Sequence, residues 1–366
     1  MKIALIGTGG MGKKYAVMLG NQLSAVVCRS EESKRWAADT LSSDVKRYDS
    51  VEEMYRNPDE YDAVLIVTPH KTHPELAIKA FELGKHVFCD KPAGVSVLQA
   101  HQMNDAAEKS GKIYAMMFHQ RLYKKYIRIK QMLDEQYLGE IKRVMLVNSR
   151  YYRTMHYHKS GKWRSSWEGE GGGALINQGQ HILDIWQWLF GMPDSLYANI
   201  PFGKYNDFMV DDEVTLVMSY PNKMSAVLIL TTGEAIHEER IEIVGTRGSI
   251  LMEDDTLTII RYSEDSMEYG KTATVNSRDH LTYTKTVELF DKTEEPYGQM
   301  FENFFAAVQG NETLIAPGKD GLEVLKITNA AYLSAWENKE VKFPIDEIDY
   351  ELQLQAHINK EKSMAD

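Results

Sequence analysis

Lys2-Ile3-Ala4-Leu5-Ile6-Gly7-Thr8-Gly9-Gly10-Met11-Gly12 is the stretch that decides the fold. Its first part is an apolar run typical of a buried strand, and the helical pattern of residues 13–19 follows its last glycine. In a Gly-x-Gly-x-x-Gly loop between strand and helix, the glycines permit a tight turn, close approach of a pyrophosphate, and helix packing. The sequence therefore predicts a dinucleotide-binding loop made of Gly7, Thr8, Gly9, Gly10, Met11 and Gly12.

Apolar strands and helical patterns alternate over the next hundred residues. Because six strands alternate with helices, residues 1–121 are predicted to form an α/β Rossmann domain with a doubly wound parallel sheet. After the first strand, the predicted strands are 23–28, 45–47, 63–67, 87–89 and 113–118.

Polar residues follow two of these strands at their carboxyl ends, where an open parallel sheet binds its ligands. Pro92 fixes its own φ and keeps Lys91 out of helical geometry, so the lysine is expected to point into the crevice. Taken alone, a Lys-Pro turn is more often solvated, and His70 could equally cap its turn or contact the nicotinamide ribose. The candidates for cofactor binding here are Thr68, Pro69, His70, His73, Asp90 and Lys91.

The end of the second strand bears on which dinucleotide is bound. An acidic residue there would bind the ribose 2′-hydroxyl of NAD, but the sequence reads Cys28, Arg29, Ser30. A guanidinium and a hydroxyl suit a 2′-phosphate better, which favours NADP and assigns Arg29 and Ser30 to its binding. Glu31 and Glu32 keep NAD open as the alternative, since either would face the ribose in a slightly shifted register.

A second domain is predicted over residues 122–345. Longer strands at 142–152, 213–220, 224–232, 240–244 and 257–262 indicate an α+β domain on a large, mostly antiparallel open sheet with helices on one face. Pro221-Asn222-Lys223 is expected to be a tight turn. An aromatic stripe between 301 and 308 is expected to be core, and the charged tail 346–366 to be solvated.

The other informative segment runs from Trp163 to Trp188, where a glycine-rich turn leads into an apolar helix. Asn177, His181 and Asp184 recur at spacings of four and three and are expected to share one face of that helix. A polar stripe on an apolar helix is buried at a cost or faces a cleft. Alone, His181 is more often a satisfied core histidine, whereas beside a nucleotide domain it becomes the leading proton carrier.

Three motifs together carry a resemblance. The glycines of 7–12, the Asp90-Lys91-Pro92 turn, and the segment Gly171–Asp184 resemble the glucose-fructose oxidoreductase/inositol dehydrogenase/MocA family over nearly the whole chain before the tail. The resemblance implies catalytic roles beside the nicotinamide for Lys91 and His181. Asp90 stands where that family usually has Glu, and Asn177 stands where many members have Asp.

The implied reaction is hydride transfer between nicotinamide and a hydroxyl or keto carbon of a sugar, inositol or related polyol. His181 would exchange the hydroxyl proton, Lys91 would stabilise alkoxide character, and Asn177 would orient the substrate. Residues that precede the histidine helix either line the substrate cleft or pack the loop, and these are Arg153, Trp163, Arg164 and Trp167. His156 and His158 lack further ligands at a metal-site spacing, so no metal is expected.

Two other classes of function stay open at this stage. One is an NAD-dependent glycoside hydrolase of the same fold, which oxidises a sugar transiently, and the other is a dinucleotide-sensing protein without turnover. Only the hydrolase would release phenol from an aryl glycoside without net cofactor reduction. Retention of both Lys91 and His181 speaks against the sensor.

Composition limits the partners and the compartment. The 366 residues carry a net charge of −11, which argues against nucleic-acid and anionic-membrane surfaces. Two cysteines that end apolar runs read as packed thiols, and the sequence shows neither a signal pattern nor a membrane span, so a cytoplasmic protein is expected. The open sheet face, with Val144, Leu146, Val217 or their alternates, predicts a homo-oligomer, either a dimer or a tetramer.

Overall fold

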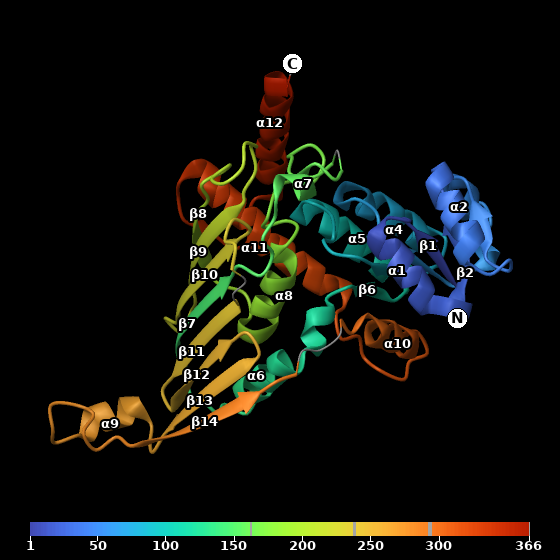
Figure 1. Ribbon diagram of the computed structural model, residues 1–366. Helices are drawn as coiled ribbons and strands as arrows, with labels where there is room; N and C mark the ends of the chain where they lie inside the picture. The colour runs from blue at the N-terminus through green and yellow to red at the C-terminus, as the bar shows by residue number, and fades with distance from the viewer. Residues whose placement is uncertain (162, 237–238, 292–294, 366) are drawn as a thin grey trace. The chain divides into compact units, whose positions relative to one another are not determined.

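The structure is a computed structural model that describes residues 1–161, 163–236, 239–291 and 295–365 (Figure 1). By their contacts, these residues form two compact units. The first unit comprises Met1–His119, Gly169–Gly171 and Glu295–Lys326, and the second comprises Gln120–Glu168, Gly172–Glu294 and Ile327–Asp366. The domain boundaries expected from the sequence, after residues 121 and 345, remain predictions, and residues 295–326 group with the first unit.

The first unit is built on a parallel sheet with the strand order β3-β2-β1-β4-β5-β6. This order confirms the predicted doubly wound α/β fold. The strands are β1 Ile3–Ile6, β2 Leu23–Val27, β3 Lys46–Tyr48, β4 Ala63–Ile66, β5 His86–Cys89 and β6 Tyr114–Met116. The helices are α1 Gly10–Leu19, α2 Glu31–Thr40, α3 Val51–Tyr55, α4 His73–Glu82, α5 Val97–Ser110 and α10 Tyr297–Val308, with short 3-10 turns η1 Gly20–Gln22, η2 Pro58–Glu60 and η3 His70–Thr72.

Helix α10 completes the core of the first unit. Phe301 and Phe304 are buried, and their rings lie 5.2 and 5.1 Å from the ring of Phe88 in β5. The expectation that the aromatic stripe is core is therefore confirmed for these two residues. Burial of such rings removes a large apolar area from water, which stabilises the packing of α10 on the sheet.

The second unit is built on a sheet with the order β14-β13-β12-β11-β7-β10-β9-β8-β15. Strands β7 and β10 pair in parallel and the other neighbours pair antiparallel, as the mostly antiparallel prediction requires. The strands are β7 Ile141–Asn148, β8 Ser195–Asn199, β9 Glu213–Ser219, β10 Ser225–Thr231, β11 Glu239–Gly245, β12 Gly248–Glu253, β13 Thr256–Tyr262, β14 Tyr283–Leu289 and β15 Val341–Lys342.

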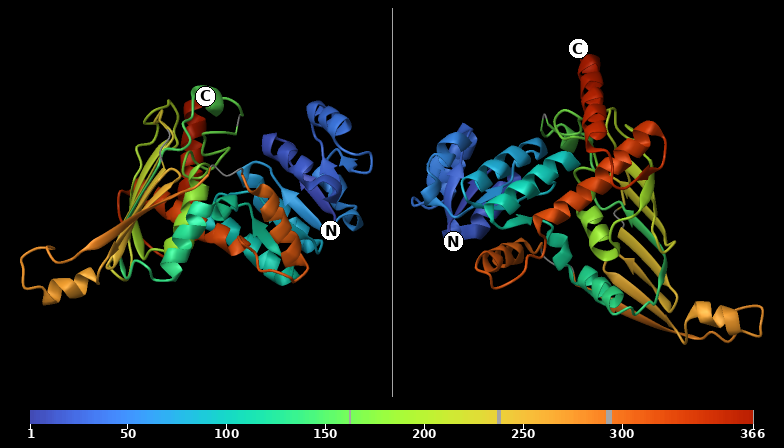
Figure 2. Two further views of the ribbon diagram at one scale, coloured as in Figure 1. Left: turned by 60° about the horizontal axis from the view of Figure 1, so that its bottom comes forward. Right: turned by 180° about the vertical axis from the view of Figure 1, so that it is seen from behind.

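Helices cover one face of this sheet (Figure 2). The helices of the unit are α6 Lys124–Asp134, α7 Met155–His158, α8 Gly179–Phe190, α9 Ser266–Thr272 and α12 Glu347–Ala365, while α11 Gly318–Glu337 contributes residues to both units. A 3-10 turn, η4 His119–Leu122, precedes α6. The predicted turn at 221–223 connects β9 to β10, where the Lys223 N–H donates to the Tyr220 carbonyl at 2.9 Å.

The two faces of the sheet differ in burial. Val144 and Leu146 are 0% exposed and belong to the covered face, whereas Val217 is 49% exposed on the other. Val217 pairs with Val227, which in turn pairs with Met145, so the open face carries the alternates of the first two residues. Of the residues expected on the open face, Val144 and Leu146 are therefore corrected to the core.

The carboxyl-terminal tail is a helix that packs on its own unit. In α12, Tyr350 is buried, and its ring stacks on that of Trp336 at a centroid distance of 5.6 Å. Leu354 and Ile358 continue the same buried stripe one and two turns later. The prediction of a solvated tail is therefore wrong for this helix, while Asp366 lies outside the described residues.

Candidate active site

The loop after β1 has the geometry that its glycines predict. Gly7 has φ +108°, and a Cβ there would lie 2.2 Å from the Val67 carbonyl oxygen. A Cβ on Gly12 would lie 1.8 Å from the Gly7 carbonyl oxygen, so both positions exclude side chains. A Cβ on Gly9, by contrast, would meet no described atom within 4 Å. Internal packing therefore does not explain Gly9, and the space beside the first turn of α1 is open to a ligand.

The residues after β2 show how the acidic side chains are engaged. Ser30 caps α2, because its hydroxyl accepts from the Ser33 N–H at 3.1 Å. Glu32 accepts from the Lys13 ammonium at 2.8 Å, and Glu31 lies 3.5 Å from the Lys34 ammonium. Both carboxylates thus have cationic partners, while Arg29 is exposed directly beyond the strand.

The turn after β4 holds two buried histidines. His70 is 4% exposed, and its Nδ1 lies 3.1 Å from the Glu170 carbonyl oxygen. His73 is 1% exposed, with Nδ1 2.8 Å from the Pro92 carbonyl oxygen and Nε2 2.7 Å from the Thr68 carbonyl oxygen. The assignment of His73 to the cofactor is corrected, because backbone contacts occupy both of its ring nitrogens.

The turn after β5 carries the predicted catalytic lysine. Lys91 is partly exposed, and its main-chain N–H donates to Asp90 Oδ1 at 2.8 Å. Burial raises the pKa of Asp90, and the charges of Lys91 and His73 oppose that rise. The Lys91–Pro92 peptide is cis. Because β1 and β5 both flank β4 in one parallel sheet, the glycine loop and Lys91 lie along the same sheet edge.

In the second unit, Asp211 holds the glycine run that precedes α8. Its Oδ1 accepts from the Gly173 N–H at 2.8 Å and from the Tyr332 hydroxyl at 2.7 Å, and its Oδ2 accepts from the Leu175 N–H at 2.6 Å. Burial raises the pKa of Asp211, and these donors oppose the rise. A Cβ on Gly172 would lie 2.2 Å from the Tyr332 hydroxyl oxygen, which explains why glycine occurs there.

The predicted polar face of α8 is only partly present. The helix begins at Gly179, so Asn177 lies in the turn before it and does not share a helical face with His181. Asp184 is 0% exposed and forms a bidentate ion pair with Arg121, with N–O distances of 2.8 and 2.5 Å. Asp184 therefore holds α8 to the segment before α6, while His181 is partly exposed in the first turn.

Tyr157 gathers several predicted substrate residues. Its hydroxyl oxygen accepts from the Arg164 guanidinium at 2.6 Å, from the Asn177 amide at 3.1 Å and from the Gln178 amide at 3.0 Å. The guanidinium carbon of Arg153 lies 4.2 Å from the centre of the same ring. Sequence reasoning missed Tyr157, because its partners lie up to 21 residues away and no local pattern marks them.

The two tryptophans of this loop have different roles. Trp163 is partly exposed, and the Arg164 guanidinium carbon lies 4.5 Å from its ring centre. Trp167 is 0% exposed, and its Nε1 donates to the Met209 carbonyl at 3.0 Å. Its ring packs against the rings of Phe202, Tyr332, Trp336 and His357. Trp167 is therefore a core residue, and its predicted place in the substrate lining is corrected.

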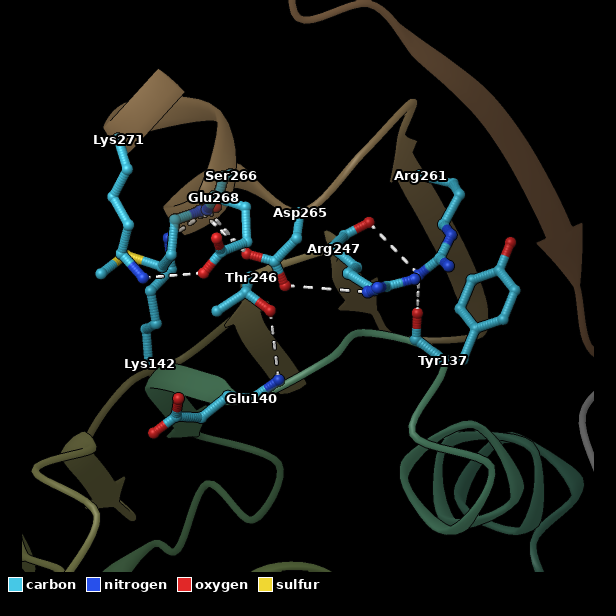
Figure 3. Close-up of polar contacts among 11 residues, drawn as sticks. Tyr137, Glu140, Lys142, Thr246, Arg247, Arg261, Asp265, Ser266, Glu268 and Lys271 are labelled. Carbon is cyan, nitrogen blue, oxygen red and sulfur yellow. Dashed lines mark hydrogen bonds and ion pairs between the residues drawn. The ribbon is translucent and has the colours of Figure 1, made fainter. Parts of the chain in front are cut away.

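A hollow of about 600 Å³ lies elsewhere on the second unit, and residues of α9 help to line it. Its charges pair with one another: Arg247 lies 3.7 Å from Asp265, and Lys271 lies 2.7 Å from Glu268 (Figure 3). Each cationic group there thus has an acidic neighbour. None of the predicted site residues is among those that line the hollow.

Two family models match the chain. The oxidoreductase family's NAD-binding Rossmann fold matches residues 1–118, and the same family's C-terminal alpha/beta domain matches residues 130–343. The chain is 25% identical to scyllo-inositol 2-dehydrogenase (NADP(+)) of Bacillus subtilis over 359 residues, which covers 93% of this chain and 95% of that protein. It is also 25% identical to D-glucoside 3-dehydrogenase of Escherichia coli, with 92% and 95% covered.

Solved structures agree with this fold. The WlbA dehydrogenase of Bordetella pertussis, solved with NADH and UDP-GlcNAcA, superposes with a TM-score of 0.78 at 20% identity, with 94% of this chain and 99% of that one covered. The chain belongs to the Gfo/Idh/MocA family of NAD(P)-binding oxidoreductases.

Proposed function

We propose that the protein is a sugar or polyol dehydrogenase that transfers a hydride between nicotinamide and a CH–OH carbon, with NADP preferred over NAD. The observation that carries this proposal is the common sheet edge of the glycine loop and Lys91, since β1 and β5 flank β4. Curated relatives that act on scyllo-inositol and on D-glucosides support the substrate class.

Lys91 and His181 are the proposed catalytic residues. When bound, the nicotinamide supplies the hydride acceptor or donor. The Lys91 ammonium donates a hydrogen bond to the reacting oxygen and stabilises its developing negative charge. The His181 imidazole takes the hydroxyl proton during oxidation and returns it during reduction. Imidazole side chains suit both directions because they exchange protons near neutral pH.

The proposed substrate residues are Asn177, Arg153, Arg164 and Trp163. Arg153 and Arg164 supply charged donors for hydroxyl or acidic groups, and Trp163 supplies an aromatic face for a sugar ring. Tyr157 joins this set, because it holds Arg164 and Asn177 through its hydroxyl oxygen.

The proposed cofactor residues are the glycine loop, Arg29, Ser30, residues 68–70 and Asp90. Arg29 is the proposed partner of the 2′-phosphate. The preference for NADP is supported by Glu31 and Glu32, because both carboxylates pair with lysines. The Ser30 hydroxyl caps α2, so Ser30 is proposed to contribute its backbone to the cofactor site beside Arg29.

We also propose a cytoplasmic homo-oligomer that buries the open sheet face. Val217 is 49% exposed there, beside Val227 and Met145, and an apolar row of this kind is typical of an interface. The thiols of Cys28 and Cys89 are buried and free, which fits a reducing compartment. Within the described residues, helices long and apolar enough to cross a membrane are absent.

A substrate panel tests the activity. The full chain is incubated with myo-inositol, scyllo-inositol, glucose and methyl glucosides, with NADP+ and NAD+ in parallel, and reduced cofactor is followed by absorbance. Turnover of at least one polyol or sugar, faster with NADP+, is expected. Tight NADPH binding without any turnover would instead indicate a sensor. Phenol release from an aryl glycoside without net reduction would indicate a hydrolase.

A further inference from the structure

His73 bridges the carboxyl ends of two adjacent strands of the first unit. Thr68 follows β4 and Pro92 follows β5, and these strands pair in parallel. Nε2 of the ring lies 2.7 Å from the Thr68 carbonyl oxygen, and Nδ1 lies 2.8 Å from the Pro92 carbonyl oxygen. Both distances are those of short N–H···O hydrogen bonds.

The two contacts impose a condition on the protonation of the ring. A backbone carbonyl oxygen can only accept, and a neutral imidazole has one N–H and one lone pair. In either neutral tautomer, one ring nitrogen would direct its lone pair at a carbonyl oxygen less than 3 Å away. Turning the ring over would place C–H groups at these distances, well inside the ~3.3 to 3.6 Å of C–H···O contacts. Only the doubly protonated ring satisfies both acceptors.

The charges around His73 oppose one another. Burial has the largest effect on His73 and lowers its pKa from the ordinary value, and the Lys91 ammonium lowers it further, whereas the Pro92 and Thr68 carbonyls and the Asp90 carboxylate oppose that shift. His70, the neighbouring ring, lies at a centroid distance of 6.3 Å. A buried imidazolium is costly unless it is paired and hydrogen-bonded, and here Asp90 supplies the counter-charge while the two carbonyls satisfy the N–H groups.

We propose that His73 is a buried imidazolium that ties the Asp90-Lys91-Pro92 turn to the end of β4 and thereby positions Lys91. It is a positioning residue, because its ring contacts the backbone carbonyls of Thr68, after β4, and Pro92, after β5. The part that concerns Lys91 rests on the proposed function, whereas the protonation state does not.

Nuclear magnetic resonance of ¹⁵N-histidine-labelled protein tests the protonation state. The His73 resonances are identified by their loss in His73→Gln. Both ring nitrogens should stay in the protonated range from about pH 6 to about pH 8, an interval over which an ordinary histidine loses its proton. His86 is the internal control, because its Nδ1 accepts from the Ile113 N–H at 3.0 Å and must be unprotonated. A single unprotonated His73 nitrogen at pH 7 would overturn the proposal.

Hydrogen exchange tests the positioning without any need for turnover. The amides of Lys91, Ala93, Gly94 and Val95 should exchange about tenfold faster in His73→Gln, because the two N–H donors of a glutamine side chain share one nitrogen and cannot span the two carbonyls that the separate ring nitrogens reach. His86→Gln, at the other end of β5, should leave them unchanged. Equal protection in His73→Gln and the parent would refute the positioning role.

Steady-state kinetics test whether the two contacts of His73 matter for catalysis. With scyllo-inositol or the best substrate of the panel, His73→Gln should lower kcat about tenfold or more with little change in the Kd of NADPH. If Lys91→Ala leaves kcat intact, the proposed function fails, while the resonances of His73 still decide its protonation state. If Lys91→Ala abolishes turnover and His73→Gln does not alter kcat, the positioning proposal fails alone.

Discussion

Glu361 of α12 is expected to secure the loop that carries the proposed substrate residues. Its carboxylate accepts from the Trp167 N–H at 3.0 Å and from the Glu168 N–H at 2.9 Å. Hydrogen bonds to a charged group contribute about 1.5 to 3 kcal/mol each when shielded, and partial exposure reduces this. Glu361→Ala should therefore lower the stability of the second unit by about 1 to 3 kcal/mol in total.

Lys362 provides a matched control one residue away. Its ammonium lies 2.7 Å from the Glu168 carboxylate, but both side chains are more than half exposed. A surface ion pair of this kind contributes less than about 1 kcal/mol. Lys362→Ala should thus change stability far less than Glu361→Ala, although both residues contact the same loop.

Differential scanning calorimetry and steady-state kinetics measure the difference. Glu361→Ala should lower the Tm of the second unit by about 2 to 8 °C. It should also raise KM for the panel substrate, because Trp163 and Arg164 belong to the released loop, while the Kd of NADPH stays unchanged. Equal effects of Glu361→Ala and Lys362→Ala would show that the two hydrogen bonds of Glu361 do not secure the loop, and so would a Glu361→Ala protein with parental Tm and KM.

Two further predictions concern the cofactor and the assembly. Arg29→Ala should weaken NADPH binding by about 1 to 3 kcal/mol and leave NADH binding almost unchanged, as titration by fluorescence would show. Equal losses for both cofactors would contradict the assignment. Val217→Lys should shift the protein to smaller species in sedimentation at micromolar concentration, whereas Val17→Lys, on the exposed surface of α1, should not. A parent protein that sediments as a monomer would refute the proposed interface.

The first unit could be predicted from sequence because its signals are local. A strand, a glycine loop and a helix follow one another within 19 residues, and periodicity marks each element. The role of His73 could not be predicted this way. Its partners are backbone carbonyls 5 and 19 residues away, and their direction depends on how β4 and β5 pair.

Helical periodicity predicted the start of α8 wrongly. It placed Asn177, His181 and Asp184 on one face, but the glycine run held by Asp211 delays the helix to Gly179. The partner of Asp184 is Arg121, 63 residues earlier, and a buried ion pair over such a separation leaves no pattern in the sequence.

The buried side of the tail helix is visible in the spacing of its apolar residues, although the tail, residues 346–366, is rich in charged residues. Its charged residues suggested a solvated segment, yet Tyr350, Leu354 and Ile358 recur every four residues, as on the buried side of a helix. A count of that spacing would have predicted α12. Its packing partner, Trp336, could not have been predicted without the fold.

The pH dependence of kcat/KM in His181→Asn tests whether His181 carries the proton. If His181 transfers the proton and Lys91 stabilises charge, the limb of the kcat/KM profile near neutral pH should vanish in His181→Asn and persist in Asn177→Ala. Both His181→Asn and Lys91→Ala should lower kcat by about 10²-fold or more, with little change in NADPH binding. A His181→Asn protein that keeps both the limb and most of the rate would show that His181 is not the proton carrier.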